Sequence, residues 1–391
     1  RTKIYTSSSP QVSVTHCGGD LVISTGMENA VTAVADGLEL QEAVDSLTLS
    51  SSGDMKLLLP AAANVSIEKV NGDLVIKNLS GDLSLGEVRG DAVFTGLAHA
   101  KINIIHSDLS AKNIDGLLSI QTLHGDAALR RVADVAVGVM HGDLSAQVVN
   151  GRVDLSESYG DVSLRSVNGD VSINHCARDV NLRNLGGRTA VQGVKGDIRL
   201  VGGLSAAEHT FAAAGDIIVR WPANTPLNLS ATAPQIVNRL PLEKEMEVEH
   251  TLTGRLGDGE TTATFTAGGR IVLKEDQMIK ARWEDEGDNA FAFGFDFDFA
   301  NLGEQISNQV NEGIARFTSH IETQFGPDFG EKVAQKAARK AEEAARKAEQ
   351  AAERARQRAD RQTERQAARN MGSYGRPPTP PPPPRPKASA E

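Results

Sequence analysis

The chain has 391 residues, of which 40% are hydrophobic, only 4% are aromatic and 37 are glycines. This composition suits a thin core built from repeated turns better than a bulky globular enzyme. The net charge of −10 is unevenly distributed: residues 1–330 carry 26 basic and 43 acidic side chains, whereas residues 331–391 carry 15 basic and 8 acidic ones. An acidic body repels phosphate, so we expect no nucleic-acid binding by the body, and membrane contact only through the basic tail.

Two cysteines, Cys17 and Cys176, are too few for a disulfide framework and are expected to be free thiols. Free thiols favour a reducing compartment, which predicts a cytoplasmic protein. The alternative is the cell surface, if a signal segment precedes Arg1. No apolar run approaches the ~18 residues of a membrane-spanning helix.

Residues 1–59 are expected to form strands that cap one end of a stacked sheet. Residues 11–24 and 46–60 have strand-like patterns of irregular spacing. The open strand edges at the end of such a stack must be covered.

Residues 60–221 contain a short repeated unit that begins with Gly-Asp. The unit at residues 160–168 reads Gly-Asp-Val-Ser-Leu-Arg-Ser-Val-Asn. Val162 and Leu164 are two residues apart and share one face of a short strand, and Val167 points inward again after the turn. Glycine is expected to supply the backbone freedom of a tight corner, and aspartate to bond turn amides. The corner residues are Gly72, Asp73, Gly81, Asp82, Gly90, Asp91, Gly125, Asp126, Gly142, Asp143, Gly160, Asp161, Gly169, Asp170, Gly196 and Asp197.

The spacing of these corners indicates two units per turn. Every second corner from Asp73 to Asp197 carries aspartate, at intervals of about 18 residues, whereas the corners between them carry a mixed set. One regular edge and one variable edge predict an all-β fold, a single-chain parallel β-solenoid (β-helix) with about 18 residues per turn. Gly-Asp also starts hairpin turns, so a meander of antiparallel hairpins is the alternative.

Residues 222–300 are expected to form capping strands at the other end. In Phe291–Phe299, five phenylalanines alternate with small or acidic residues, so a strand here has one aromatic face. That strand either caps the last turn or recruits a second copy of the chain.

The C-terminal segments change to helical and then to proline-rich patterns. Residues 301–326 have an apolar stripe at helical spacing, which predicts an amphipathic helix. Residues 331–370 are rich in charge and place alanines at heptad spacing, so they form either a weak coiled coil or a solvated helix. Residues 371–391 include five consecutive prolines and are expected to be disordered. A protein partner or self-association is expected through Phe291–Phe299 and these helices.

Two stretches carry a family resemblance. The sequences VSVTHCGGDLVI (residues 12–23) and LPAAANVSIEKVNGD (residues 59–73), with the chained Gly-Asp corners, resemble the bacterial "putative adhesin" domain of unknown function, also called the toast-rack domain. The resemblance covers roughly residues 12–274. It implies a β-solenoid found beside bacterial envelope-stress proteins, similar in architecture to the polymer-forming bactofilins, with no known catalytic residues.

No enzyme signature occurs in the sequence. It lacks a Gly-x-Ser-x-Gly elbow, a phosphate loop, a His-Glu-x-x-His motif and zinc-spaced Cys/His clusters, so we expect no enzymatic activity and no cofactor. The Gly-Gly-x-Gly-x-Asp pattern of calcium-binding β-rolls is also missing.

One histidine pattern is a candidate metal or pH-sensitive site. His106, His124 and His141 each stand two residues before a regular-edge aspartate, namely Asp108, Asp126 and Asp143. In the predicted register the imidazoles lie ~5 Å apart in a line. One interpretation is a site that binds a transition metal or a strip that responds to pH. The favoured interpretation is that histidine is only tolerated at these exposed corners.

The expected function is a non-enzymatic structural or interaction scaffold. An exported adhesin or ligand-binding module is the first alternative. A carbohydrate-active β-helix enzyme is the second, and it would need a groove with aromatics and paired carboxylates. The repeats contain almost no aromatics.

Overall fold

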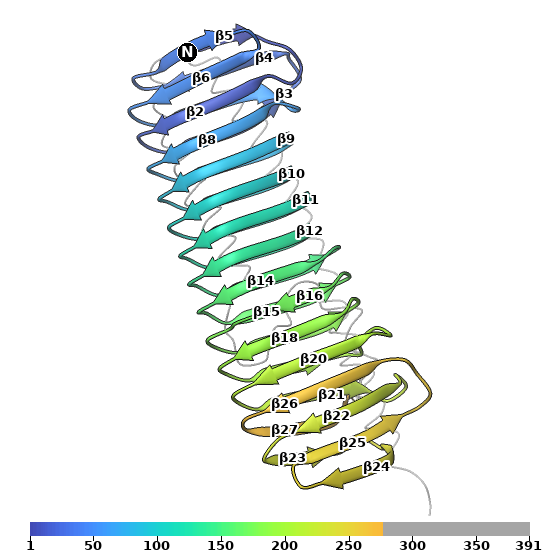
Figure 1. Cartoon of the computed structure of the whole chain (residues 1–391). Helices are drawn as coiled ribbons and strands as arrows, with labels where there is room; N and C mark the ends of the chain where they lie inside the picture. Colours follow the sequence, from blue (N-terminus) through green and yellow to red (C-terminus); the bar gives the residue numbers. More distant parts are fainter. Residues whose placement is uncertain (277–391) are drawn as a thin grey trace, which may run out of the picture. The chain divides into compact units, whose positions relative to one another are not determined.

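The computed structural model describes residues 1–276, and all the regular structure in this part of the chain is β-strand. The strands stack along one axis (Figure 1). Within the described residues, no helix has the length and apolarity needed to cross a membrane. Phe291–Phe299, the expected helices at residues 301–326 and 331–370, and the tail at residues 371–391 lie outside the described residues.

The 27 strands all belong to one hydrogen-bonded system. The N-terminal strands are β1 (Thr2–Tyr5), β2 (Gln11–Cys17), β3 (Leu21–Gly26), β4 (Ala30–Ala35), β5 (Glu39–Ala43), β6 (Ser46–Ser51), β7 (Met55–Pro60) and β8 (Asn64–Val70). The central strands are β9 (Leu74–Val88), β10 (Ala92–Ile105), β11 (Leu109–Leu123), β12 (Ala127–Met140), β13 (Leu144–Val149), β14 (Val153–Ser158), β15 (Val162–Val167), β16 (Val171–Ile173), β17 (Val180–Leu185), β18 (Thr189–Val194), β19 (Ile198–Val201), β20 (Glu208–Ala213) and β21 (Ile217–Pro222). The C-terminal strands are β22 (Leu227–Thr232), β23 (Gln235–Asn238), β24 (Glu243–Val248), β25 (Thr251–Leu256), β26 (Thr262–Ala267) and β27 (Arg270–Asp276).

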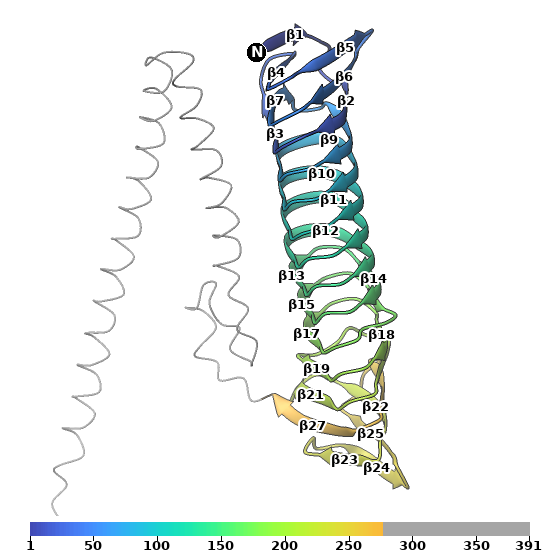
Figure 2. The same cartoon turned by 90° about the vertical axis from the view of Figure 1, so that its left-hand side faces the viewer.

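Two faces follow from the strand pairings (Figure 2). Face I consists of β2, β8, the second halves of β9–β12, and β14, β16, β18, β20 and β26. Face II consists of β3, the first halves of β9–β12, and β13, β15, β17, β19, β21 and β27. All these pairings are parallel. The prediction of an all-β chain with a repetitive parallel sheet is therefore confirmed for residues 1–276.

The register gives the number of residues that separate paired positions in neighbouring strands, and this number is nearly constant through the centre of the stack. Leu74 pairs with Ala92, Ala92 with Leu109 and Leu144 with Val162. The inward pattern predicted for β15 is confirmed, because Val162, Leu164 and Val167 are buried while Ser163 and Arg165 are partly exposed.

On face II, a left-handed residue accounts for the position of the third inward side chain at the eighth place of the unit. Positive φ angles recur at one register position on face II, between the outward residue and the last inward one. These residues are Asn78, Gly96, Asn113, Arg131, Val148, Ser166, Asn184 and Gly202. The residue with positive φ changes the direction of the strand, as a β-bulge does, so the side chain that follows it points into the core.

The expected role of the corner glycines is wrong. Among the described residues the glycines with positive φ are Gly37, Gly96, Gly193, Gly202 and Gly257, and none of them is one of the corner glycines predicted within residues 60–221. A Cβ on Gly90 would instead lie 2.2 Å from Asp73 Oδ1 and 2.7 Å from the carbonyl carbon of Gly72. Glycine is required because successive turns approach too closely for a side chain.

Each end of the stack contains a crossover that the sequence did not predict. At the N-terminal end, β2 lies between β6 and β8, and β3 lies between β7 and β9. At the other end, β26 lies between β20 and β22, and β27 lies between β21 and β23. Antiparallel strands then extend the ends, with β1, β4 and β5 at one and β24 and β25 at the other.

Candidate functional site

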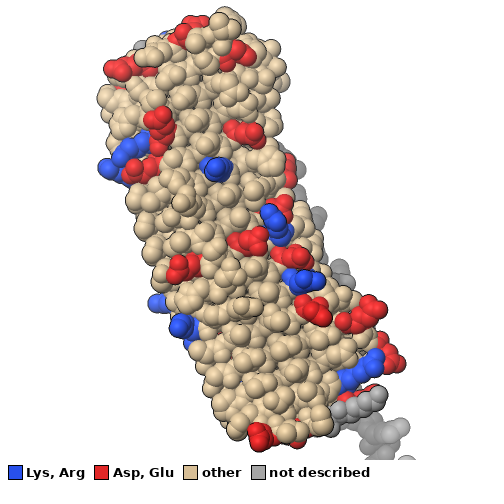
Figure 3. Space-filling model, viewed as in Figure 1, with Lys and Arg blue, Asp and Glu red and all other residues tan. Residues whose placement is uncertain are grey.

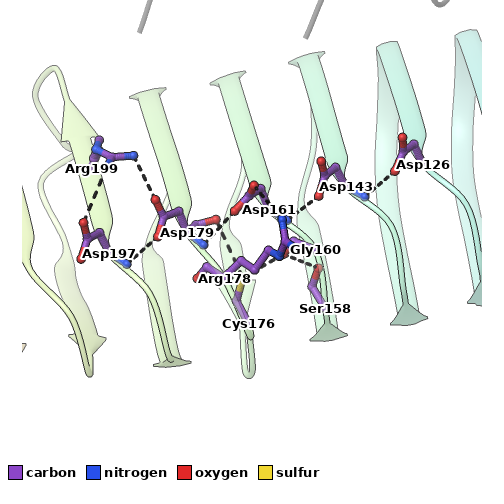
Figure 4. Close-up of polar contacts among 10 residues, drawn as sticks. All are labelled: Asp126, Asp143, Ser158, Gly160, Asp161, Cys176, Arg178, Asp179, Asp197 and Arg199. Carbon is purple, nitrogen blue, oxygen red and sulfur yellow. Dashed lines mark hydrogen bonds and ion pairs between the residues drawn. The ribbon is translucent and has the colours of Figure 1, made fainter. Parts of the chain in front are cut away.

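The regular edge joins the end of each face I strand to the next face II strand, and it carries a continuous ladder of aspartates (Figure 4). Ten hydrogen bonds of 2.7–3.1 Å each run from the backbone N–H of one aspartate to Oδ1 of the aspartate in the adjacent turn. The members, in stacking order, are Asp54, Asp20, Asp73, Asp91, Asp108, Asp126, Asp143, Asp161, Asp179, Asp197 and Asp216. The ladder ends where Arg270 donates its backbone N–H to Asp216 at 2.8 Å.

The variable edge has the same kind of hydrogen bond, from a backbone N–H to a side-chain oxygen of the adjacent turn, but the acceptor residues differ. Asp170 accepts the N–H of Arg188 at 2.8 Å, as the sequence predicted for an aspartate at a corner. Asp82 instead donates its own N–H to Asn64 Oδ1 at 3.0 Å. The corner aspartates therefore bond amides of neighbouring turns and hold the stack together.

Stacking carboxylates one strand apart has an electrostatic cost. Burial raises the pKa of Asp73, Asp126 and Asp161, and neighbouring ladder carboxylates raise it further. At the end of the ladder the pKa shift has the opposite sign, because the Arg270 N–H and then its guanidinium lower the pKa of Asp216. Arg199 also bridges the ladder, with Nη1 3.2 Å from Asp179 and Nη2 3.6 Å from Asp197.

We expect Asp143→Ala to lower the free energy of unfolding by about 1–3 kcal/mol, because it leaves the Asp161 N–H without its acceptor in a partly buried corner. Asp143→Asn keeps an Oδ1 acceptor and removes one of three adjacent charges, so it should cost much less. Thermal unfolding of both variants checks this. An asparagine variant as unstable as the alanine one would contradict the acceptor role of the carboxylate.

The candidate histidines lie beside this ladder in one stack of rings. The ring centroids of His106 and His124 are 5.2 Å apart, and those of His124 and His141 are 4.8 Å apart, with interplanar angles of 5°. Tyr159 continues the stack at 5.1 Å from His141. Tyr159 was not among the predicted members of this stack, although it precedes Gly160-Asp161 at the place where the histidines precede their own corners.

The geometry of the stack does not suit one metal ion. The lone pairs of imidazole nitrogens lie in the ring plane, so parallel rings do not converge on a shared ligand position. Within residues 1–276, no group of three or more His, Cys, Asp or Glu side chains is arranged to hold a metal. Burial, and then the neighbouring His141 and His106, lower the pKa of His124. The position of His124 inside the stack therefore disfavours the charged form of its ring.

Comparisons with known proteins add little. No family model matches the chain, and no curated protein matches it. A solved structure described as a "putative cell adhesion protein", from Clostridium sporogenes, is similar at 13% identity, covering 70% of this chain and 97% of that chain, with a TM-score of 0.14. A likeness at this level carries no argument about function, and the toast-rack resemblance stays a prediction.

His209 is a buried histidine on the variable edge, and its two hydrogen bonds define the protonation state of the ring. His209 Nδ1 accepts the N–H of Thr189 at 3.1 Å. Its Nε2 lies 3.0 Å from the carbonyl oxygen of Ser205, which can only accept, so Nε2 carries the proton. The ring is therefore neutral, and burial lowers its pKa.

We expect acid to destabilise the stack through His209. Because the folded pKa is below the unfolded value, the unfolded chain binds more protons once the pH falls below about 6.5, and stability is lost as the pH falls from there towards the folded pKa. His209→Asn keeps an acceptor without titrating, as Asn64 shows at Asp82. The midpoint of the parent should fall relative to that of the variant between pH 7.5 and pH 5. Parallel pH profiles would contradict the assignment.

Both cysteines are buried and unpaired. Burial raises the pKa of Cys17 and of Cys176 to about 11, so thiolate is scarce at neutral pH. Such thiols resist oxidation in any compartment. They therefore do not discriminate between the expected cytoplasmic localisation and the cell-surface alternative, which cell fractionation separates.

Proposed function

We propose that the chain is a single-chain parallel β-solenoid of about 18 residues per turn that acts as a non-enzymatic structural or interaction scaffold. The nearly constant separation along the chain between paired strands supports the solenoid. The link to the bacterial cell envelope or its stress response is part of the proposal and rests on the family resemblance.

The observation that carries this proposal is the aspartate ladder. A general acid or base needs a carboxylate directed at a substrate. In the ladder each Oδ1 already accepts a backbone N–H, so the most regular acidic feature of the chain serves the stacking of turns. Repeated bonding of this kind favours a stiff scaffold.

A depression on face I offers little to a carbohydrate-active enzyme. It has a volume of about 700 Å³. Its lining contains one carboxylate, that of Asp82, and no Phe, Tyr or Trp. Glycosidases use a pair of carboxylates, and sugar rings commonly pack on aromatic side chains. The composition of this depression supports binding or structural roles over hydrolysis.

An assay for new reducing ends tests the non-enzymatic proposal. The full chain, incubated with polygalacturonate, heparin, xylan and dextran, should release none above a buffer control. Release that Asp82→Asn or Asp143→Asn abolishes would overturn the proposal, because it would assign a catalytic carboxylate.

We also propose that partners or further copies bind through Phe291–Phe299 and the helices that the sequence predicts at residues 301–326 and 331–370. Affinity capture with the full chain, and with a chain ending at Gly330, tests the contribution of the segment after that residue. Partners retained equally by both chains would place the binding surface before residue 331.

A further inference from the structure

The depression on face I crosses five neighbouring strands, near the point where each strand leaves the variable edge. These strands are β2, β8 and the second halves of β9, β10 and β11. Two columns of paired positions form its floor. The first column consists of Gln11, Asn64, Asp82, His99 and Leu117, and the second of Ser66, Ser84, Lys101 and Ser119.

Asp82 differs from the other aspartates in its own column along the variable edge. Asp134 accepts the backbone N–H of Arg152 at 2.8 Å, and Asp170 accepts the equivalent bond one step further along. Asp82 pairs with His99, and the register between β9 and β10 shifts immediately before this pair. Among residues 1–276, nothing donates a hydrogen bond to the Asp82 carboxylate. The depression therefore contains a carboxylate that the stacking of turns does not use.

Lys101 places the opposite charge in the second column. It pairs with Ser84, which stands two residues after Asp82 in β9. Strand spacing of ~4.8 Å and a rise of ~3.3 Å per residue put the Cα atoms of Asp82 and Lys101 roughly 8 Å apart. Neither side chain forms an ion pair with any residue of the described part of the chain. Few charged side chains lie over the middle of this face (Figure 3).

Neutral hydrogen-bonding groups surround these two charges. Asn64 Oδ1 and His99 Nδ1 each accept a backbone N–H of the adjacent turn, at 3.0 and 3.1 Å. The Asn64 NH2 group and, in the neutral ring, the Nε2–H of His99 are thus left as donors. The hydroxyls of Ser66, Ser84 and Ser119 can both donate and accept. The floor therefore suits a ligand rich in amide or hydroxyl groups.

The charges exclude several classes of ligand. A chain of phosphates or acidic sugars would be repelled by the Asp82 carboxylate and would meet one lysine in this depression. A neutral glycan would find no aromatic ring to pack on. A ligand that carries an ammonium and a carboxylate group matches both charged side chains.

The separation of the two charges sets the length of such a ligand. A single α-amino acid holds its ammonium and carboxylate on one carbon atom, too close together to reach Asp82 and Lys101 at once. Each further residue of an extended peptide adds ~3.3–3.6 Å. A peptide of about three residues therefore spans the distance between the two side chains.

We propose that the depression on face I binds a short peptide with free termini, about three residues long. Its ammonium group lies at Asp82, its carboxylate lies at Lys101, and its amide groups meet the serine, asparagine and histidine side chains between and beside them. This inference rests on the scaffold proposal, in which the body binds without cleaving.

An NMR titration of the full chain, isotope-labelled at its nine histidines, tests the inference with trialanine as the probe. Loss of one signal in His99→Gln identifies the His99 ring. That signal should shift saturably as trialanine is added. The signals of His106, His124 and His141, which lie beside the regular edge, should not move.

Capped peptides test which side chain meets which terminus. Acetylating the amino terminus removes the ammonium, and amidating the carboxyl terminus removes the carboxylate. Each cap should weaken binding to the parent about two- to fivefold, as expected for exposed ion pairs. In Asp82→Asn, acetylation should no longer weaken binding, and in Lys101→Gln, amidation should no longer do so.

Asp154→Asn and Lys195→Gln are the matched controls. Asp154 lies further along the same face, in β14, and Lys195 precedes a corner of the regular edge. Both variants should keep the preference for each free terminus. Thermal unfolding of all four charge variants shows whether folding is retained.

Any of three results would overturn the inference: no saturable shift of the His99 signal, equal affinity of the parent for capped and uncapped trialanine, or the same loss of preference in the control variants. The same spectra report whether the peptide is cleaved. Release of alanine would overturn the non-enzymatic proposal, whereas absent binding without cleavage would overturn the peptide site alone.

Discussion

Leu164→Asp should lower the free energy of unfolding by about 3–5 kcal/mol, because it places an unpaired carboxylate in the dry interior. Leu164 is 1% exposed and lies in β15 between Ala146 and Leu182 of the adjacent turns. Both neighbours are apolar and buried, so the new charge finds no partner in its own layer. In a stacked repeat, the interfaces on both sides of the altered turn weaken together.

Ser163→Asp is the matched control for this change. Ser163 is the preceding residue in the same strand, but its side chain faces outward and is partly exposed. The same carboxylate there should change stability by no more than about 0.5 kcal/mol. Urea unfolding of both variants measures the difference. Similar midpoints for the two variants would show that the assigned inward register is wrong.

The repeat made the core of each turn predictable from the sequence. Apolar residues at fixed places in the repeated unit, such as Val162 and Leu164, identify the inward face because side chains alternate along a strand. The corner aspartates were also predictable, since Asp170 and its equivalents bond amides as expected. Both inferences depend on local pattern alone.

Features that depend on which turns become neighbours were not predictable. The sequences of β2 and β3 do not indicate that β2 lies between β6 and β8, or that β3 lies between β7 and β9. Any parallel strand of suitable length can form the same backbone hydrogen bonds. The pairing of Arg220 with Lys274 is hidden for a related reason, because these residues stand far apart along the chain and only the register of β21 with β27 brings them together.

The Gly-Asp motif correctly located the corners, but the expected reason for glycine there was wrong. Gly was expected for its freedom in φ, yet the corner glycines have ordinary φ angles. The distances in the stack instead assign their role to close contact between turns. Close contact between turns makes a side chain at such a corner costly.

Gly160→Ala should lower the free energy of unfolding by about 3 kcal/mol or more. A Cβ on Gly160 would lie 2.2 Å from the carbonyl oxygen of Gly142 and 2.4 Å from its carbonyl carbon. These are backbone atoms of the adjacent turn, which cannot move aside singly because the ladder bond from Asp161 to Asp143 holds the two turns together. The substitution must therefore separate the turns or break that bond.

Gly53→Ala tests whether close contact or the motif itself sets the cost. Gly53 belongs to the same Gly-Asp motif, in the corner between β6 and β7 at the N-terminal end of the stack. Its nearest neighbour would be Asp36 Cβ at 3.5 Å, an ordinary contact, and its φ is not positive. Alanine should therefore change stability by about 0.5 kcal/mol or less there. Thermal unfolding of both variants gives the comparison, and equal losses at the two positions would return the explanation to backbone freedom.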